Sequence, residues 1–106
     1  MNVSPPPNWG KIQGTVRGEP CTGDPVPVPA TVQINLVNDP ETGYTLSADD
    51  QGRYALWLPR GRYDVIVARD GWKPESQRLR ISAGLVSTVD FTLDPVHPCG
   101  TRVGGR

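Results

Sequence analysis

The feature that most constrains this chain is the alternation of apolar and polar residues in short runs. Val32, Ile34 and Leu36 alternate with Gln33 and Asn35, and the same period of two recurs along the chain. This is the period of a strand with one buried face, because successive side chains of a strand point to opposite sides of the sheet. The pattern predicts an all-β chain without significant helix. The expected strands cover residues 11–17, 32–37, 43–47 (the weakest), 54–58, 62–67, 78–81 and 88–93.

Turn-forming residues separate these runs. Asp49-Asp50-Gln51-Gly52 is expected to form a tight turn, because aspartate side chains cap backbone amides and glycine readily adopts a positive φ. Pro59-Arg60-Gly61 is expected to form a second turn. Seven short strands at this spacing predict a seven-stranded, antiparallel-type Greek-key β-sandwich.

Length and charge restrict the organisation further. The 106 residues correspond to one domain, and the 11 basic and 11 acidic residues cancel, so no net charge favours binding to nucleic acid. No apolar run approaches the roughly 18 residues of a membrane span, so no membrane insertion is expected. The expected layout is a proline-rich linker at 1–9, a sandwich module at 10–95 and a tail at 96–106. The first residues do not resemble a signal peptide, and the chain is interpreted as a module of a longer protein.

Four motifs follow one another along the chain: Ile12-x-Gly14-x-Val16, Asp49-Asp50-Gln51-Gly52-Arg53-Tyr54, Leu58-Pro59-x-Gly61-x-Tyr63-x-Val65-x-Val67 and Gly71-Trp72. In this order they resemble the carboxypeptidase regulatory-like domain, a family similar to Cna B-type repeats and to prealbumin-like (transthyretin-like) sandwiches. The resemblance implies a non-catalytic accessory, interaction or spacer module of a larger secreted or cell-surface protein. The implied partners are neighbouring domains or a polysaccharide or protein ligand, and a monomer is expected.

Cys21 and Cys99 are the two cysteines of the chain, too far apart in sequence for a metal knuckle or a Cys-x-x-Cys motif. In sandwiches resembling this one, the first and last strands lie side by side and parallel. The resemblance therefore implies a Cys21–Cys99 disulfide where these strands end, and with it an oxidising compartment. The alternative is a cytosolic protein with two reduced thiols.

Some Cna B-type domains join their first and last strands by an isopeptide bond from a lysine, assisted by a buried acid. Arg17 stands at the position that resembles the lysine, and Val67 at the position that resembles the acid. Neither side chain can perform that chemistry, so no such bond is expected. Lys11 and Asp90 remain as a conceivable pair, although both lie on the polar side of the alternation.

Residues for other chemistry are scarce. His97 is the single histidine and is expected to be an exposed tail residue. Asp49 and Asp50 are interpreted as turn residues, because the ligand series of a calcium loop is missing. No catalytic, metal-ligating or cofactor-binding residue is predicted, and no cofactor is expected.

A contact surface is predicted on residues 53–68, interpreted as a hairpin in which Leu58 lies opposite Tyr63. Its outer face would then carry an apolar stripe, and exposed apolar patches mark contact sites. The stripe would dock a neighbouring domain; alternatively, Trp57 would stack on sugar rings in a carbohydrate-binding module, with Tyr44 or Trp9 as further platforms. Packing of Trp57 against its own loops is the purely structural interpretation. The predicted stripe consists of Ala55, Trp57, Ile66 and Ala68.

The remaining aromatic and basic residues have structural interpretations. Tyr54 and Tyr63 are predicted to point into the core with their hydroxyls at an edge, and Trp72 to cover an edge of the core. Arg78 and Arg80 form a basic stripe that is expected to be solvated.

Overall fold

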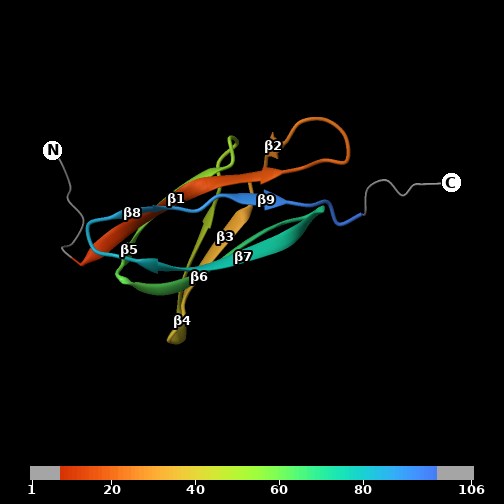
Figure 1. Ribbon diagram of the computed structural model, residues 1–106. Helices are drawn as coiled ribbons and strands as arrows, with labels where there is room; N and C mark the ends of the chain where they lie inside the picture. Colours follow the sequence, from red (N-terminus) through yellow and green to blue (C-terminus); the bar gives the residue numbers. More distant parts are fainter. Residues whose placement is uncertain (1–7, 98–106) are drawn as a thin grey trace.

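The structure is a computed structural model that describes residues 8–97, apart from the side chain of Pro40 (Figure 1). The described residues contain no helix, so no helical segment among them could cross a membrane. All regular structure is strand: β1 (Trp9–Gly18), β2 (Val26–Pro27), β3 (Thr31–Leu36), β4 (Asp39–Ser47), β5 (Arg53–Pro59), β6 (Gly61–Arg69), β7 (Trp72–Ile81), β8 (Val86–Thr88) and β9 (Phe91–Leu93).

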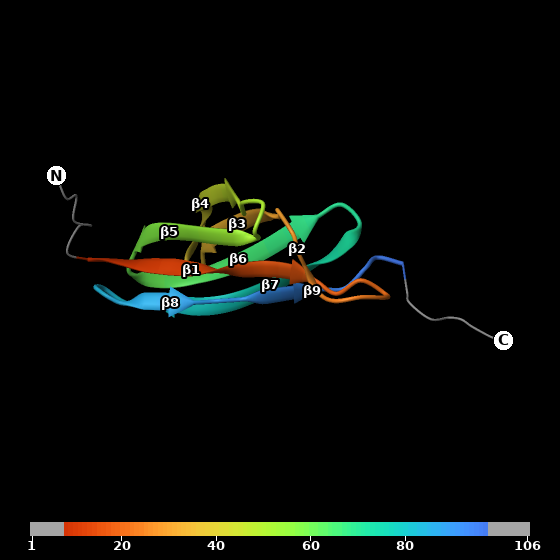
Figure 2. The same cartoon turned by 90° about the horizontal axis from the view of Figure 1, so that it is seen from above.

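These strands form two sheets that pack face to face (Figures 1 and 2). The first sheet is centred on β1, which pairs with β2 and β5 on one side and with β8 and β9 on the other. The second sheet has the order β4-β3-β6-β7. Every pair of neighbours is antiparallel except β1 with β8 and β9. The predicted sandwich, with parallel first and last strands, is confirmed.

The predicted number of strands is wrong, because the described chain has nine. β2 is a two-residue strand that pairs with Arg17 and Gly18 and is too short to show alternation. The last predicted strand is divided into β8 and β9. At the division, the Thr15 N–H donates to a carboxylate oxygen of Asp90 at 2.9 Å rather than to a main-chain oxygen, which interrupts the ladder.

The predicted hairpin of residues 53–68 is also wrong, because β5 and β6 lie in different sheets. Leu56 of β5 pairs with Ile12 of β1, whereas β6 lies between β3 and β7. Only Arg60 separates the two strands, so the chain crosses between the sheets at this point. Leu58 and Tyr63 do both point inward, as expected, but from opposite sides of the core. Alternation specifies which face of each strand points inward, but it does not determine which other strand lies beside it.

The core lies between the sheets and receives the inward residues of both. No polar or charged side chain is buried among the described residues. Tyr63 is buried and its hydroxyl donates to the Pro59 oxygen at 2.7 Å, as predicted for a core tyrosine at an edge. The buried set is Ile12, Val16, Val28, Ala30, Val32, Ile34, Ala48, Tyr54, Leu58, Tyr63, Val65, Val67, Ile81, Val89, Phe91 and Leu93.

Trp72 closes one edge of this core, as predicted. It is partly buried and packs against the core cluster. Its ring occupies the space in which Gly18 has no side chain, since a Cβ on Gly18 would lie 2.4 Å from a ring carbon. Because Gly18 has no side chain, the Trp72 ring can pack against β1 at this position.

The turn at Asp49 has the predicted form. One Asp49 carboxylate oxygen accepts hydrogen bonds from the main-chain N–H groups of Gln51 and Arg53, at 2.8 and 2.9 Å. Gly52 has a φ of 77° and its carbonyl accepts a bond from the Val16 N–H at 2.7 Å. The turn thereby fastens the start of β5 to β1.

Candidate functional site

The outer face of the first sheet carries the residue that the sequence marks as exceptional, Trp57. Alternate residues of β5, β1 and β8 point to this face and form rows across the three strands. Trp57 pairs with Lys11, which pairs in turn with Val86 on the other side. In the next row, Gln13 pairs with Ala55 and Thr88. We refer to Trp57, Lys11 and Val86 as the Trp57 row.

The Trp57 row is an exposed, largely apolar surface. Trp57 is 41% exposed and Val86 is 55% exposed, and Leu85 beside Val86 is 60% exposed. The Lys11 ammonium lies 5.7 Å from the centroid of the Trp57 ring, in the range of a cation–π contact. The outward orientation predicted for Trp57 is confirmed.

The other two proposed aromatic platforms differ in position. Trp9 shares the outward alternation of Lys11 on β1 and lies opposite Pro59, which is two residues beyond Trp57. Tyr44 lies on β4 of the second sheet, where it packs against the core. Trp9 and Trp57 can therefore act on one surface, whereas Tyr44 cannot join them.

The predicted apolar stripe does not exist as one surface. Ala55 and Trp57 lie on the outer face of the first sheet, but Ile66 and Ala68 belong to β6 and face outward from the second sheet. Ile66 is partly buried between Gln33 and Ser76. The error follows from the crossing at Arg60, which places β5 and β6 on opposite sides of the sandwich.

Lys11 and Val86 lie beside Trp57 in place of Ile66 and Ala68, and the sequence does not predict them as members of this surface. Lys11 alternates outward with Gln13 and Thr15, so its orientation was available from the pattern. Its position beside Trp57, and that of Val86, depend on the pairing of β1 with β5 and β8. No local signal specifies that pairing.

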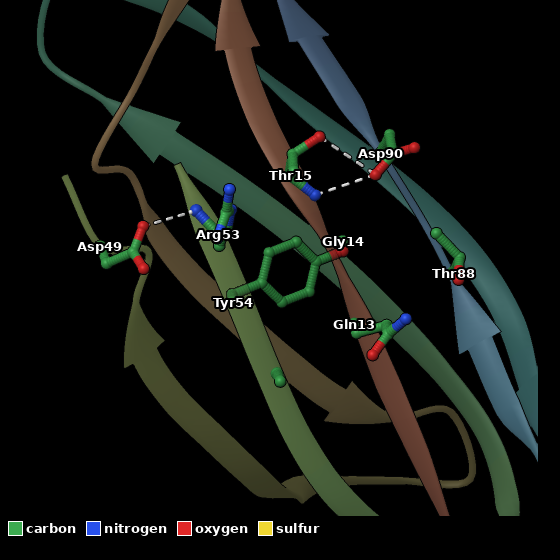
Figure 3. Close-up of a pocket in the computed structure, with 9 residues that line it drawn as sticks. Gln13, Gly14, Thr15, Asp49, Arg53, Tyr54, Thr88 and Asp90 are labelled. Carbon is green, nitrogen blue, oxygen red and sulfur yellow. Dashed lines mark hydrogen bonds between the residues drawn. The ribbon is translucent and has the colours of Figure 1, made fainter. Parts of the chain in front are cut away.

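An open hollow of about 430 Å³ continues from the Trp57 row along the same sheet (Figure 3). Most of the residues that line it carry a polar group, with Asp49 and Arg53 at one end and Asp90 at the other. Asp90 accepts hydrogen bonds from the Thr15 N–H at 2.9 Å and from the Thr15 hydroxyl at 3.1 Å. The hollow is lined by Gln13, Gly14, Thr15, Asp49, Arg53, Tyr54, Ala55, Thr88 and Asp90.

Tyr54 lies in the floor of this hollow and is almost fully buried. Its ring extends toward β1 at Gly14 (Figure 3). Its hydroxyl donates to the main-chain oxygen of Val89 at 2.5 Å. Burial raises the pKa of Tyr54, and the negative charge of Asp90 raises it further. The phenol therefore stays protonated to a higher pH than an exposed tyrosine does, and it acts as a structural donor.

The groups of this face are suited to binding rather than to proton transfer. The Asp49 and Asp90 carboxylates already accept bonds from main-chain amides, which holds them in place as part of the turn and of the strand break. Among residues 8–97, no group of three or more His, Cys, Asp or Glu side chains could hold a metal ion. The face offers an aromatic ring, aliphatic surface, amides and hydroxyls, which together can stack on and hydrogen-bond to a partner.

Cys21 lies at the opposite pole, where β1 and β9 end. It shares a hollow of about 450 Å³ with Glu19, Lys73 and His97, so Cys21 is close to a residue two positions before Cys99. His97 is exposed, as predicted. Cys99 lies outside the described residues, and the disulfide stays a prediction.

The positions considered for an isopeptide bond have separate environments. Arg17 is exposed on β1, and Val67 is buried in the core among other apolar residues. Lys11 lies over Trp57, and Asp90 binds Thr15 further along the sheet. Each of the two alternative residues thus has a partner of its own.

Sequence comparison finds one family and one curated relative. The sequence profile described as "Carboxypeptidase regulatory-like domain" matches residues 11–94. Structural protein 27 of a virus (isolate Australia/Victoria) is 31% identical over 51 residues, which are 48% of this chain and 10% of that protein. The match thus spans about a tenth of the viral protein.

Solved structures with a similar fold include two bacterial proteins. The minor pilin of Streptococcus agalactiae matches with a TM-score of 0.72 and 15% identity, over 91% of this chain and 48% of the pilin chain. The Bacillus anthracis TIE protein matches with a TM-score of 0.66 and 18% identity, over 84% of this chain and 17% of the other. At these identities the likeness concerns the fold.

Proposed function

Because the chain belongs to the carboxypeptidase regulatory-like domain family, we propose that it is a non-catalytic spacer and accessory module of a larger secreted or cell-surface protein. In this proposal the residues before Trp9 and residues 96–106 are linkers, and the sandwich between them, which begins with Trp9 of β1, holds neighbouring domains apart. The likeness to a pilin sandwich supports a structural role of this kind.

The observation that carries the proposal is the parallel pairing of the first and last strands. β1 begins at Trp9 at one pole of the sandwich, and β9 ends at Leu93 at the other (Figures 1 and 2). A ten-residue strand such as β1 spans about 33 Å, at roughly 3.3 Å per residue. A chain that enters and leaves at opposite poles separates whatever is attached to its two ends.

The Trp57 row is the proposed contact between this module and a neighbouring domain. An exposed tryptophan beside aliphatic side chains is the kind of anchor that carries much of the binding energy of an interface. Lys11 over the ring keeps the free surface hydrated until a partner covers it. The isolated module is expected to be a monomer.

The spacer role is tested by fusing one folded reporter domain to each end and measuring the distance distribution between the reporters by energy transfer. We expect a narrow distribution about 30 Å longer than that of the directly joined reporters, as a strand-length scaffold requires. A Gly/Ser linker of equal residue number is the control and should give a broad distribution. If the two distributions coincide, the module is not a rigid spacer.

A second candidate is carbohydrate binding, which is favoured by the position of the Trp57 row next to a hollow lined by amide and hydroxyl side chains as well as apolar surface. Trp57 would stack on a sugar ring while Gln13 and Thr88 bind its hydroxyls. Retention of the module on insoluble neutral polysaccharides tests this candidate. Retention that is lost in Trp57→Ala and kept in Thr92→Ala would support it, and no retention on any polysaccharide would exclude the role for those sugars.

A further inference from the structure

Three arginines gather at the pole where β1 begins. Arg60 lies at the crossing between the sheets, Arg62 on β6 and Arg80 on β7. Together with Asn38 of the β3–β4 turn they line a hollow of about 490 Å³. The Arg60 N–H donates to the oxygen of Asn8, which fixes this corner beside the start of β1. We call Arg60, Arg62 and Arg80 the arginine cluster.

The arginine cluster is not explained by the stability of the fold. Arg62 and Arg80 are direct cross-strand partners, and like charges in such positions repel one another. Two residues further along the same strands, opposite charges face each other instead. Asp64 lies opposite Arg78 and accepts two hydrogen bonds from it, at 2.8 and 3.3 Å. Of the two arginines expected to form a basic stripe, Arg78 therefore pairs with Asp64, whereas Arg80 forms no ion pair among the described residues.

Nearby carboxylates are already engaged. Asp64 is held by Arg78, and this bond lowers the pKa of Asp64. Asp39, next to Asn38, accepts a hydrogen bond from the Thr42 hydroxyl at 2.7 Å. Within residues 8–97, the Arg78–Asp64 pair is the one ion pair formed.

The composition does not account for the cluster either. Basic and acidic residues are equal in number, so three arginines around one hollow are a local concentration of charge. None of the residues that line the hollow is acidic. All three arginines are exposed and can reach a ligand from solvent.

We propose that the arginine cluster is a binding site for a phosphate or sulfate group. Guanidinium groups present paired N–H donors that match the oxygens of these anions, and their charge does not depend on pH in the physiological range. A doubly charged group would relieve the repulsion between Arg62 and Arg80 while Arg60 and the Asn38 amide complete its coordination. The group is carried either by a small free anion or by a polymer with phosphate or sulfate esters, and this ligand is independent of the spacer role.

The test is a titration of isotope-labelled protein, followed by the NMR signals of backbone amides and arginine side chains. The probes are sodium phosphate, sodium sulfate and a heparin hexasaccharide, each at constant ionic strength. We expect the signals of Arg60, Arg62 and Arg80 to move together. Saturation by either small anion identifies a free-anion site, and saturation by heparin alone identifies a polymer site.

Two variants and a control separate specific binding from general charge effects. The double variant Arg62→Gln/Arg80→Gln should weaken binding by about tenfold or more, because bidentate charge-assisted bonds are lost. Arg17→Gln removes an exposed arginine of the other sheet and should change affinity by less than about twofold. Equal losses in the two proteins, or no binding of any probe by the wild type, would overturn the proposal.

A stability measurement excludes a purely structural role. Removal of one repelling charge in Arg80→Gln should leave the urea midpoint unchanged or raise it. A lower midpoint would mean that Arg80 supports the fold, and the proposal would then fail.

Discussion

The Tyr54 hydroxyl of β5 hydrogen-bonds to the main-chain oxygen of Val89, which lies on the far side of β1. Tyr54 crosses β1 at Gly14, its cross-strand partner. A Cβ on Gly14 would lie 1.7 Å from the Val89 oxygen and 2.9 Å from the Tyr54 hydroxyl. The bond therefore joins the two neighbours of β1 through a space that only glycine leaves open.

Gly14→Ala should destabilise the sandwich strongly. The added methyl group would meet main-chain atoms, so the last strand must move away from β1 and the Tyr54 bond must lengthen. We expect a loss of about 2–4 kcal/mol in the free energy of unfolding. Urea unfolding of the isolated domain measures it.

Gln13→Ala is the matched control, because Gln13 is the preceding residue on the same strand and points outward. Its effect should stay within about 0.5 kcal/mol. A Gly14→Ala protein as stable as the wild type would show that the last strand does not approach β1 in this way.

Tyr54→Phe should remove the hydrogen bond while keeping the ring. It leaves the Val89 oxygen buried without this donor, at a cost of about 1–2 kcal/mol. In an absorbance titration of the tyrosines, the ionisation step at the highest pH should also be missing in this variant, because burial and Asp90 raise the pKa of Tyr54. If all three tyrosines of the wild type ionise together, Tyr54 is not buried as described.

The same group predicts how stability depends on pH. The folded protein holds the Tyr54 proton more tightly than the unfolded chain does, whose tyrosines have the ordinary pKa of 10.0. The contribution of Tyr54 is therefore fully present below pH 10 and is lost as the pH rises above it. In Tyr54→Phe the unfolding free energy should therefore fall less steeply above pH 10. Some of the fall should remain, because burial also raises the pKa of Tyr63.

Trp57 and Leu58 form a natural pair for testing the contact surface, because these adjacent residues face opposite sides of β5. Leu58 is fully buried, and Leu58→Ala should cost about 2–5 kcal/mol. Trp57→Ala should cost about 1 kcal/mol or less, mainly from its contact with Lys11. Urea unfolding distinguishes them. Losses of equal size would make Trp57 a core residue and would remove the basis for the Trp57 row as a docking surface.

A Cys21–Cys99 disulfide is expected in natively purified protein. Alkylation without reductant should then leave the intact mass unchanged, and reduction should expose two thiols and lower the stability by about 2–5 kcal/mol. Two alkylated cysteines before reduction would contradict the pairing. A further mass loss equal to ammonia or water would reveal a cross-link that Arg17 and Val67 are expected to preclude.

Much of the fold follows from the sequence itself. Alternation at Tyr54, Leu58, Tyr63 and Val65 correctly specifies which side of each strand is buried, since inward side chains must be apolar in a two-layer core. Asp49 and Gly52 specify their turn, because its bonds and positive φ are local properties of those residues. The exposure of Trp57 follows from the same alternation.

The tertiary structure alone decides which strands are neighbours. β5 and β6 have inward faces that would suit a hairpin equally well, yet they lie in different sheets, since hydrogen-bonded pairing is a property of two strands and not of either pattern. That pairing places Lys11 and Val86 beside Trp57, and it brings Arg62 opposite Arg80 with Arg60 at the crossing. Both proposed sites therefore combine residues that are close in sequence or oriented by local alternation with neighbours that join them only when the sheets assemble.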